Sequence, residues 1–507
     1  MSSSFLTFLP GKLGIQLLAG SLAVLTLINV SFKTWKALQK VGFNPGFRTF
    51  IGPESLLCDL VGGYIPYDVS RDVMTWIQVY PKIRAMFVIA DPNAAKEVVS
   101  NRARFPKYTA TYTVLEYFGS NILTTEGEEW KHQRKLTAPT FSEKNNRLVW
   151  EETIRVIEDM FSCWGVNNQE VPVNHCLDIT LPITLMVISG AGFGRRIPWS
   201  EDTIVPPGHK MSFKTALHTV SNWIIFIVVL PKWVFWLSKK LRNAYLAKDE
   251  FVSYMQEMIE QRRANLDEER YDLFSALLRV NESSTKEEGR LGEDELFAIE
   301  QEEQEKLFQH ILSILGDRYI PNYEEFNALS YVMAVINETL RLFPSVTIIP
   351  KVAAEDTTLP VTLADGRVEP VFIKGGTEVY VNTTGLHYNR GFTYEYFRVF
   401  TYSSTRLAKY WDDPNVFSPS RFLGDYNRDA FMPFSAGARA CIGRGFGETE
   451  MVAALTMIIR KYKVEIKNPE AYAGMNKFEQ REKLLANRAG LTVTPLSVPL
   501  VFKKRDP

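Results

Sequence analysis

A short run near the C-terminal end of this 507-residue chain has residue types that could hold an iron atom. It reads F-S-A-G-A-R-A-C-I-G over residues 434–443, beginning at Phe434, and contains one cysteine, Cys441. A cysteine thiolate on haem iron must stay anionic, and backbone amides and shielding from water tune its electron donation. Gly437 and Gly443 lack Cβ atoms, so the backbone there can turn tightly and approach a flat macrocycle. The run therefore predicts a haem-thiolate site with Cys441 as the iron ligand.

Two flanking features agree with this interpretation. Arg439 is a permanent cation two residues before the cysteine, and we expect it to pair with a haem propionate. The run 443–460 has helical character, which would place the sulfur near the positive end of a helix. The alternative is a buried, inert cysteine in a turn.

This loop resembles the haem-binding loop of the cytochrome P-450 family, F-x-x-G-x-R-x-C-x-G. The resemblance is to membrane-anchored eukaryotic members of a fungal type and covers the chain from about residue 42 to its end. It implies a haem-thiolate monooxygenase that binds haem b. Such an enzyme inserts one oxygen atom from O2 into an apolar organic substrate, and an NADPH-dependent flavoprotein reductase supplies its electrons.

Two more motifs of the family stand in the family's order. Glu338 and Arg341 fit E-x-x-R on the helix-periodic run 329–343, where a spacing of three places both charges on one face. Downstream, residues 417–422 fit F-x-P-x-R-F. The resemblance implies that Arg421 of this motif completes a buried network with the other two. Taken alone, E-x-x-R is typical of a surface salt bridge with little effect on stability.

A fourth motif, W-x-x-x-R, lies far upstream. Trp130 and Arg134 are one helical turn apart on the segment 128–136, so both side chains can point the same way. The indole N–H and the guanidinium could then both donate to a haem propionate. The alternative is an exposed helix with a half-buried tryptophan.

The chain needs an electron-transfer partner. No G-x-G-x-x-G motif follows a predicted strand, so the chain cannot take hydride from NADPH itself. Lys131, Lys135 and Arg444 would form a basic surface for an acidic reductase. The same residues are equally typical of a solvated charged face.

Composition favours one large domain of mixed charge. Hydrophobic residues make up 46% of the 507 positions, enough for a sizeable core. Lys plus Arg and Asp plus Glu both total 58, so no net charge indicates a nucleic-acid partner. Four scattered cysteines are too few for a disulfide framework or a zinc site, and they favour a reducing cytosolic face.

Periodicity predicts a mainly α fold with a small β region, as in the P-450 fold. Short apolar runs predict strands at 85–90 and 378–382. The 3.6-residue pattern predicts helices at 146–163, 244–262, 303–315, 324–342 and 445–462.

The N-terminal segment predicts a membrane anchor at residues 1–32, followed by the haem-thiolate catalytic domain at 33–507. The run 13–30 is uncharged and just long enough to cross a bilayer core. Three lysines follow it and only one precedes it, so the positive-inside rule places the catalytic domain in the cytoplasm. We expect the endoplasmic reticulum membrane. A cleaved signal peptide is the alternative, although no clean small-x-small cleavage site follows.

A second apolar run, 223–237, is interrupted by Pro231 and Lys232 and is too short to span a membrane. Two interpretations remain open. The run is either core or a hydrophobic lip of the substrate entrance that dips into the membrane.

The chain departs from the family pattern at two places. Near residue 299 the family has a long apolar helix across the distal haem face, with an A/G-G-x-D/E-T motif that delivers protons. Here only Ile299, Glu300 and Gln301 separate two family-like stretches, so this central helix is missing and no distal acid and alcohol pair can be identified. The second departure is an aromatic-rich insert at 391–408. Together they suggest a skipped exon and a translated intron rather than a genuinely altered protein.

These departures put the activity of the chain as written in doubt. We expect it to bind haem poorly and to show little coupled monooxygenation. The alternatives are a catalytically dead haem-binding protein and a haem-thiolate isomerase or dehydratase, which needs neither oxygen protonation nor a reductase.

Overall fold

The apolar run at residues 85–90 forms a buried strand, as its composition predicts. This strand, β3 (Arg84–Ile89), pairs in parallel with β8 (Glu378–Asn382), whose five residues are all buried. The computed structural model describes residues 12–41, 46–51, 73–80, 84–165, 168–200, 205–264, 301–362, 367–388, 410–475, 480, 483–484, 487–488 and 494–505.

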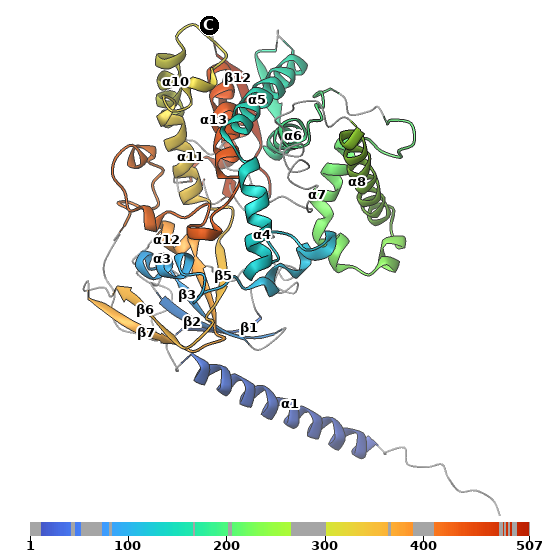
Figure 1. Cartoon of the computed structure of the whole chain (residues 1–507), viewed down its shortest axis with the longest axis vertical. Coiled ribbons are helices and arrows are strands. Elements are labelled where there is room, and N and C mark those ends of the chain that lie inside the picture. The colour runs from blue at the N-terminus through green and yellow to red at the C-terminus, as the bar shows by residue number, and fades with distance from the viewer. Residues whose placement is uncertain are drawn as a thin grey trace, which may run out of the picture. The chain divides into compact units, whose positions relative to one another are not determined.

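The chain divides into two compact units, and the first contains most of the β structure (Figure 1). Its five-stranded mixed sheet has the order β1-β2-β3-β8-β5, and β6 and β7 form a separate antiparallel pair. The remaining elements of this unit are α1 (Lys12–Lys40), β1 (Gly46–Ile51), β2 (Val73–Tyr80), α3 (Pro92–Ser100), β5 (Ile348–Val352), β6 (Thr357–Thr362) and β7 (Val368–Ile373). The short helix α12 (Thr383–Tyr388) crosses from the first unit to the second.

The second unit is mainly helical, which agrees with the predicted fold class. Its α-helices are α4 (Gly127–Thr137), α5 (Glu143–Trp164), α6 (Leu177–Val187), α7 (Phe213–Val229), α8 (Lys239–Ala264), α10 (Gln301–Leu315), α11 (Ser330–Leu342) and α13 (Arg444–Lys461). Its strands are β4 (Glu170–Val173), β9 (Tyr462–Ile466), β10 (Asn487–Arg488), β11 (Thr494–Pro495) and β12 (Leu500–Lys504). The antiparallel order β4-β12-β9 joins three of them.

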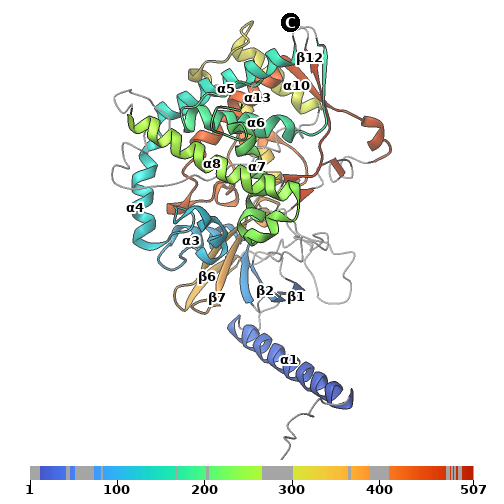
Figure 2. The same ribbon diagram turned by 90° about the vertical axis from the view of Figure 1, so that its right-hand side faces the viewer.

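Short 3₁₀ segments and one π-helical segment connect these helices. They are η1 (Thr109–Phe118), η2 (Ala138–Thr140), η3 (Ile188–Gly192, the π segment), η4 (Lys232–Trp236), η5 (Tyr323–Glu325), η6 (Pro419–Phe422), η7 (Arg428–Ala430), η8 (Gly437–Arg439) and η9 (Pro469–Tyr472). Figure 2 shows α5, α6 and α13 on one side of this unit, with α7 and α8 next to them.

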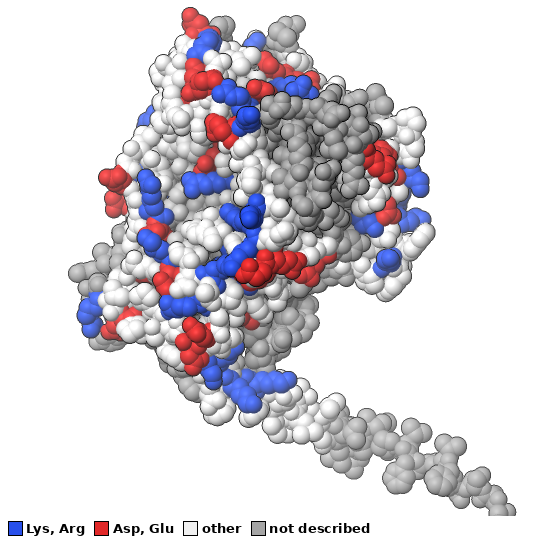
Figure 3. Space-filling view, in the orientation of Figure 1, with Lys and Arg blue, Asp and Glu red and all other residues white. Residues whose placement is uncertain are grey.

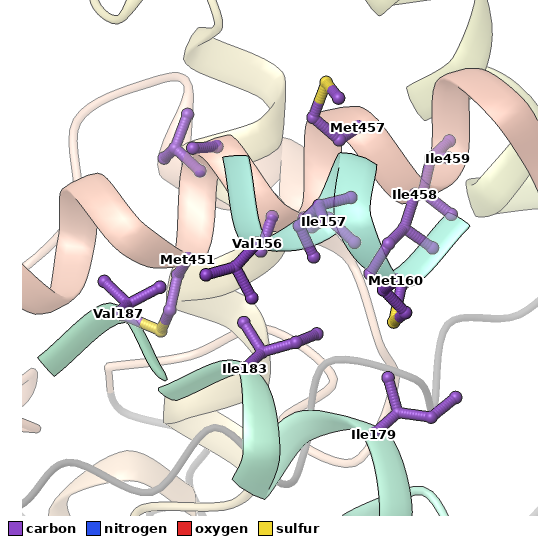
Figure 4. Packing of buried hydrophobic residues seen from close by; sticks show 14 of the residues in the cluster. Val156, Ile157, Met160, Ile179, Ile183, Val187, Met451, Met457, Ile458 and Ile459 are labelled. Carbon is purple, nitrogen blue, oxygen red and sulfur yellow. The ribbon is translucent and has the colours of Figure 1, made fainter. Parts of the chain in front are cut away.

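Helices α5, α6 and α13 form much of the core of the second unit, and α13 directly follows the cysteine loop. Side chains of α5, α6 and α13 interdigitate, and Ile157, Val187 and Met457 are fully buried (Figure 4). Helix α13 is buried around almost its whole circumference, with residues 446–447 and 449–459 all buried, which is typical of a helix surrounded by core. The residue that follows the cysteine loop is therefore the first residue of the most deeply buried helix described here.

The N-terminal segment forms α1, which begins before and ends after the predicted anchor run 13–30. Leu22, Leu25 and Ile28 are exposed on it. Within the part of the chain that the structure describes, no helix combines the length and the apolar character that crossing a bilayer requires.

One predicted helix is shorter than its pattern indicated. The run 324–342 is helical only from Ser330, because residues 323–325 form the separate turn η5. The carboxylate of Glu325 accepts the backbone N–H of Asn322 at 2.8 Å and pairs with Arg318. Tyr323 packs edge-on against the buried Trp150 with ring centroids 5.8 Å apart, so tertiary contacts override the helical periodicity. The predicted missing helix near residue 299 and the insert 391–408 lie outside the described residues, apart from the start of α10 at residue 301.

Candidate haem-binding site

The cysteine loop leads directly into α13. Helix α13 begins at Arg444, with Gly443 as its N-cap residue, as the sequence predicts. Four backbone N–H groups at a helix start lack intrahelical partners and carry partial positive charge. Cys441 therefore lies three residues before a helix start, where a thiolate is electrostatically favoured.

Backbone geometry folds the loop back on itself. The N–H of Cys441 donates to the carbonyl of Phe434 at 2.9 Å, which closes the loop, and the Phe434 side chain is buried below it. Gly437 has a φ of 69°, a left-handed conformation that favours glycine, at the start of η8. This local requirement explains why the motif has glycine at that position.

The sulfur of Cys441 is partly buried, and the groups around it shift the pKa of its thiol in opposite directions. Burial raises the pKa of the Cys441 thiol, and the Glu448 carboxylate acts in the same direction. A hydrogen bond from the Gly443 backbone and the positive charges of Arg134 and Arg444 act against burial, but the net shift is upward. A coordinating metal ion deprotonates a thiol outright, so the raised pKa does not oppose ligation. Among the described residues, Cys163, Cys176 and Cys441 are not in disulfides.

The residues predicted to hold the haem propionates gather beside this loop. Trp130 on α4 is 5% exposed, and the guanidinium carbon of Arg439 lies 4.0 Å from the centroid of its ring. The guanidinium carbon of Arg134 lies 6.0 Å from the same ring. Arg134 also donates from Nη1 to the carbonyl of Ala440 at 2.8 Å, which ties α4 to the residue before the cysteine.

Arg439 already has protein acceptors. It donates to the carbonyls of Ile122 at 3.0 Å and Thr125 at 2.6 Å, and it pairs with the Glu126 carboxylate. Burial alone would raise the pKa of Glu126, but the Arg439 guanidinium, helped by backbone hydrogen bonds, holds that pKa below its usual value. A role for Arg439 toward a propionate remains a prediction.

The structure brings Glu338, Arg341 and Arg421 together. Both oxygens of the Glu338 carboxylate accept from Arg341, at 2.7 Å from Nε and 2.9 Å from Nη2. The Nε of Arg421 and the backbone N–H of Ser418 donate to the same carboxylate at 3.1 and 2.8 Å. Glu338 and Arg341 are fully buried, so this bidentate pair differs from the surface salt bridge that the motif alone would suggest.

Backbone carbonyls complete the network. Arg341 donates from Nη1 to the carbonyls of His387 and Pro414 at 3.0 and 2.8 Å. Arg421 donates from Nη1 to the carbonyl of Asp412 at 2.9 Å. The network therefore fixes the segment that precedes the cysteine loop onto α11.

His387 is a member of this network to which the sequence analysis gave no role. Its Nδ1 lies 3.2 Å from the carbonyl oxygen of Arg341, and its Nε2 accepts the backbone N–H of Met432 at 3.0 Å. The neutral ring therefore carries its proton on Nδ1. Burial, together with the Arg341 charge, lowers the pKa of His387 to about 3. In the sequence it lies in the run G-L-H-Y-N-R, residues 385–390, which resembles the family and directly precedes the insert 391–408.

The donor set fits a haem group. A partly buried sulfur at a helix start, a backbone N–H directed at it, and an indole with two guanidinium groups beside it are the chemistry that a thiolate-bound iron porphyrin requires. In the described part of the chain, no cluster of three His, Cys, Asp or Glu residues could hold a metal ion in another way.

Basic side chains flank the loop on α4 and α13. Lys131 pairs with Glu128 at 2.5 Å, and Arg444 pairs with Glu448 at 2.8 Å. All of the lysines and arginines predicted for this surface, Lys135 included, are exposed. Figure 3 shows positive and negative residues intermixed on the face that it presents.

The cytochrome P-450 family model matches most of the chain, in three segments. They are residues 70–299, 296–392 and 397–485. The breaks between the segments fall beside residue 299 and within the run 391–408, the two places where the sequence departs from the family pattern.

Curated relatives are similar over nearly the full length. Cytochrome P-450 monooxygenase 124 of Postia placenta is 41% identical over 515 aligned positions, covering 92% of this chain and 95% of the relative. Since 515 positions exceed the 507 residues here, this chain has gaps opposite residues of that relative. Cytochrome P-450 monooxygenase prx9 of Penicillium rubens is 27% identical, and the match covers 82% of this chain and 79% of that relative. Cytochrome P-450 4A12 of Rattus norvegicus is 25% identical, covering 92% and 94%.

Proposed function

The chain belongs to the cytochrome P-450 family and is an enzyme of the haem-thiolate monooxygenase type, and we propose that Cys441 supplies its thiolate to haem b. The observation that carries the assignment is the Cys441 sulfur, which receives the Gly443 backbone N–H just before α13. The other described cysteines, Cys163 and Cys176, lie outside any such loop.

When bound, the haem iron activates O2 so that one oxygen atom enters an organic substrate. The residues of this chain bind and tune that group. Gly443 donates to the sulfur, and Trp130, Arg134 and Arg439 would donate to the propionates. The network of Glu338, Arg341 and Arg421 holds the segment before the loop in place. An apolar small molecule is the substrate class.

We propose that electrons come from an NADPH-dependent flavoprotein reductase that docks on the exposed basic side chains of Lys131, Lys135 and Arg444. Their position on α4 and α13, the helices on either side of the cysteine loop, supports this. Replacing Lys135 by Glu should lower the rate of reduction and weaken its salt dependence. Replacing Lys240, an exposed lysine on α8, should change neither quantity.

We propose that the enzyme resides at the endoplasmic reticulum membrane with its catalytic domain facing the cytoplasm. Exposed apolar side chains support membrane contact at two places: Leu22, Leu25 and Ile28 on α1, and Trp233 and Trp236 on η4. Phe235 and Ile227 are buried in a small core, so the run 223–237 is partly core and partly exposed apolar surface.

Deletion and extraction distinguish the two contacts. Removal of residues 1–32 should release the protein from microsomes into the supernatant, with carbonate extraction as the assay. If the truncated protein still pellets but is released by Trp233→Ser with Trp236→Ser, η4 dominates the attachment. If neither change releases it, the proposed attachment is wrong.

We propose further that the chain as written lacks its distal haem wall. The gaps opposite the Postia placenta relative and the break in the family match at residues 296–299 support this. An open distal face would admit water and release reduced oxygen as peroxide.

A reconstitution with reductase and NADPH tests the proposal. The chain as written should consume NADPH mainly to make peroxide, and an A/G-G-x-D/E-T helix inserted between Ala298 and Ile299 should restore product. Coupled turnover by the unmodified chain would refute the missing wall. A restored chain that shows a thiolate carbon monoxide spectrum but no turnover would favour the catalytically dead alternative.

A further inference from the structure

A histidine outside the haem site is held between two carboxylates. His209 lies in the segment before α7, and its side chain is only 4% exposed. Its Nδ1 is 2.9 Å from Oε2 of Glu250, and its Nε2 is 2.9 Å from Oε1 of Glu257. Both glutamates belong to α8 and are seven positions apart, so they lie on one face two turns apart.

The geometry fixes the number of protons. An ionised carboxylate can only accept, and a neutral imidazole has a single N–H. The Nδ1–Glu250 contact is a hydrogen bond, and the Nε2–Glu257 contact, at 2.9 Å, is an ion pair that is attractive only when Nε2 also carries a proton. The arrangement is complete when His209 is an imidazolium, and it loses one contact when a proton leaves.

Tyr254 positions the ring from the same helix. Its ring stacks on His209 with centroids 3.6 Å apart and planes 6° from parallel. Its hydroxyl donates to the carbonyl of Met211 at 2.9 Å, which ties a second point of the same segment to α8. The charged groups that act on Tyr254 are Arg195, Glu250 and Glu257, and the Arg195 guanidinium carbon lies 4.9 Å from the Tyr254 ring centroid.

We propose that His209, Glu250 and Glu257 form a proton-operated clamp that fastens the start of α7 to α8. Helices α7 and α8 are joined through η4 at one end (Figure 2), and the clamp lies away from that end, since it engages the residues before Phe213 and, on α8, Glu250 near the middle and Glu257 beyond it. Protonation closes that free end, and proton loss opens it.

Unequal exposure determines which contact breaks. The Glu257 side chain is 48% exposed and can turn into water, whereas the Glu250 side chain is 11% exposed. After proton loss the ring keeps Glu250 and releases Glu257. The segment 205–212 then remains attached through Glu250 and the Tyr254 hydroxyl, but it opens more often.

Hydrogen exchange of the full-length chain, followed by mass spectrometry, tests the clamp. Protection factors, which correct for the pH dependence of exchange itself, are compared for peptides covering 205–212 at about pH 5.5 and about pH 8, because histidine ordinarily changes charge in this range. Protection should fall about threefold at the higher pH, the factor expected for one lost, half-exposed ion pair.

Two variants make the result specific. In Glu257→Gln the amide can donate to or accept from Nε2, so the contact survives in both states and the pH difference in protection should disappear. Glu260→Gln, an exposed change on the same helix, should leave the pH difference intact. An unchanged pH difference in Glu257→Gln, or equal protection at both pH values in the unmodified chain, would overturn the clamp.

Discussion

The Glu338 network and the Cys441 loop both contain arginines close to an anionic or ionisable group, but they differ in burial and in how fully these groups are paired within the protein. In the network, the carboxylate and the Arg341 guanidinium are fully buried and every described contact is internal. In the loop, the sulfur is only partly buried, and the hydrogen bond it receives comes from the Gly443 backbone N–H. Arg134 makes one described hydrogen bond, to the carbonyl before the cysteine.

This difference distinguishes groups that stabilise the folded chain from groups that are available to bind a ligand. A buried charge is tolerated only when its partners satisfy it, so the network is complete without any cofactor. A ligand-binding group must keep capacity for a partner that the chain does not supply. Mutations in the two regions should therefore fail in different ways, the network through stability and the loop through haem.

The largest effect is expected at the cysteine. Cys441→Ser should abolish the red-shifted carbon monoxide band of the reduced haem protein, because an alcohol cannot replace a thiolate as the iron ligand. The free energy of unfolding of the haem-free protein should change little, because the side chain lies at a partly exposed loop. Cys163→Ser, at an exposed position, is the matched control that should retain the band. A surviving band in Cys441→Ser would refute the assignment.

A mutation in the network should instead lower stability. Glu338→Gln removes the charge that neutralises the buried Arg341 and should lower the free energy of unfolding by about 3–5 kcal/mol, measured by guanidinium titration. The control is Glu324→Gln, which breaks an exposed pair with Arg147 at 2.7 Å and should be barely detectable. Equal destabilisation by the two variants would show that burial does not distinguish them.

Arg134 is an arginine like those of the network, but it lies beside the cysteine loop and donates to the carbonyl of Ala440. Arg134→Met should speed haem loss to excess apomyoglobin by about tenfold, the factor for one charge-assisted hydrogen bond. Lys135→Met, the exposed neighbour on the same helix, should not change that rate. If both variants lose haem at the rate of the unmodified chain, Arg134 does not contribute to haem retention.

The most gradual effect is a pH dependence in the network. His387 has its pKa lowered from 6.5 to about 3, so between these values the unfolded chain binds a proton that the folded chain does not. The free energy of unfolding should therefore fall as pH drops below about 6.5, by at most about 1.4 kcal/mol per pH unit from this residue. Guanidinium titrations from about pH 7 to about pH 4.5 measure it. His387→Gln should flatten that slope, and an identical slope would contradict the role of this histidine.

Sequence alone determined those features that depend on local spacing. The cysteine loop, the spacing of Glu338 and Arg341, the strand 378–382 and the start of α13 all follow from residue types within a few positions of one another, because glycine turns, helix periodicity and capping are local. The family match confirmed the identification that those motifs suggested.

Tertiary structure alone decided which distant groups complete each site. The sequence could not show that the carbonyls of His387 and Pro414 satisfy Arg341, or that His209 meets two glutamates more than forty positions away. Nor could it show that η5 interrupts the periodic run 324–342, because that turn depends on Trp150 and Arg318. Burial and hydrogen-bond satisfaction are properties of the packed chain, and no local pattern encodes which remote backbone oxygen will face a given charge.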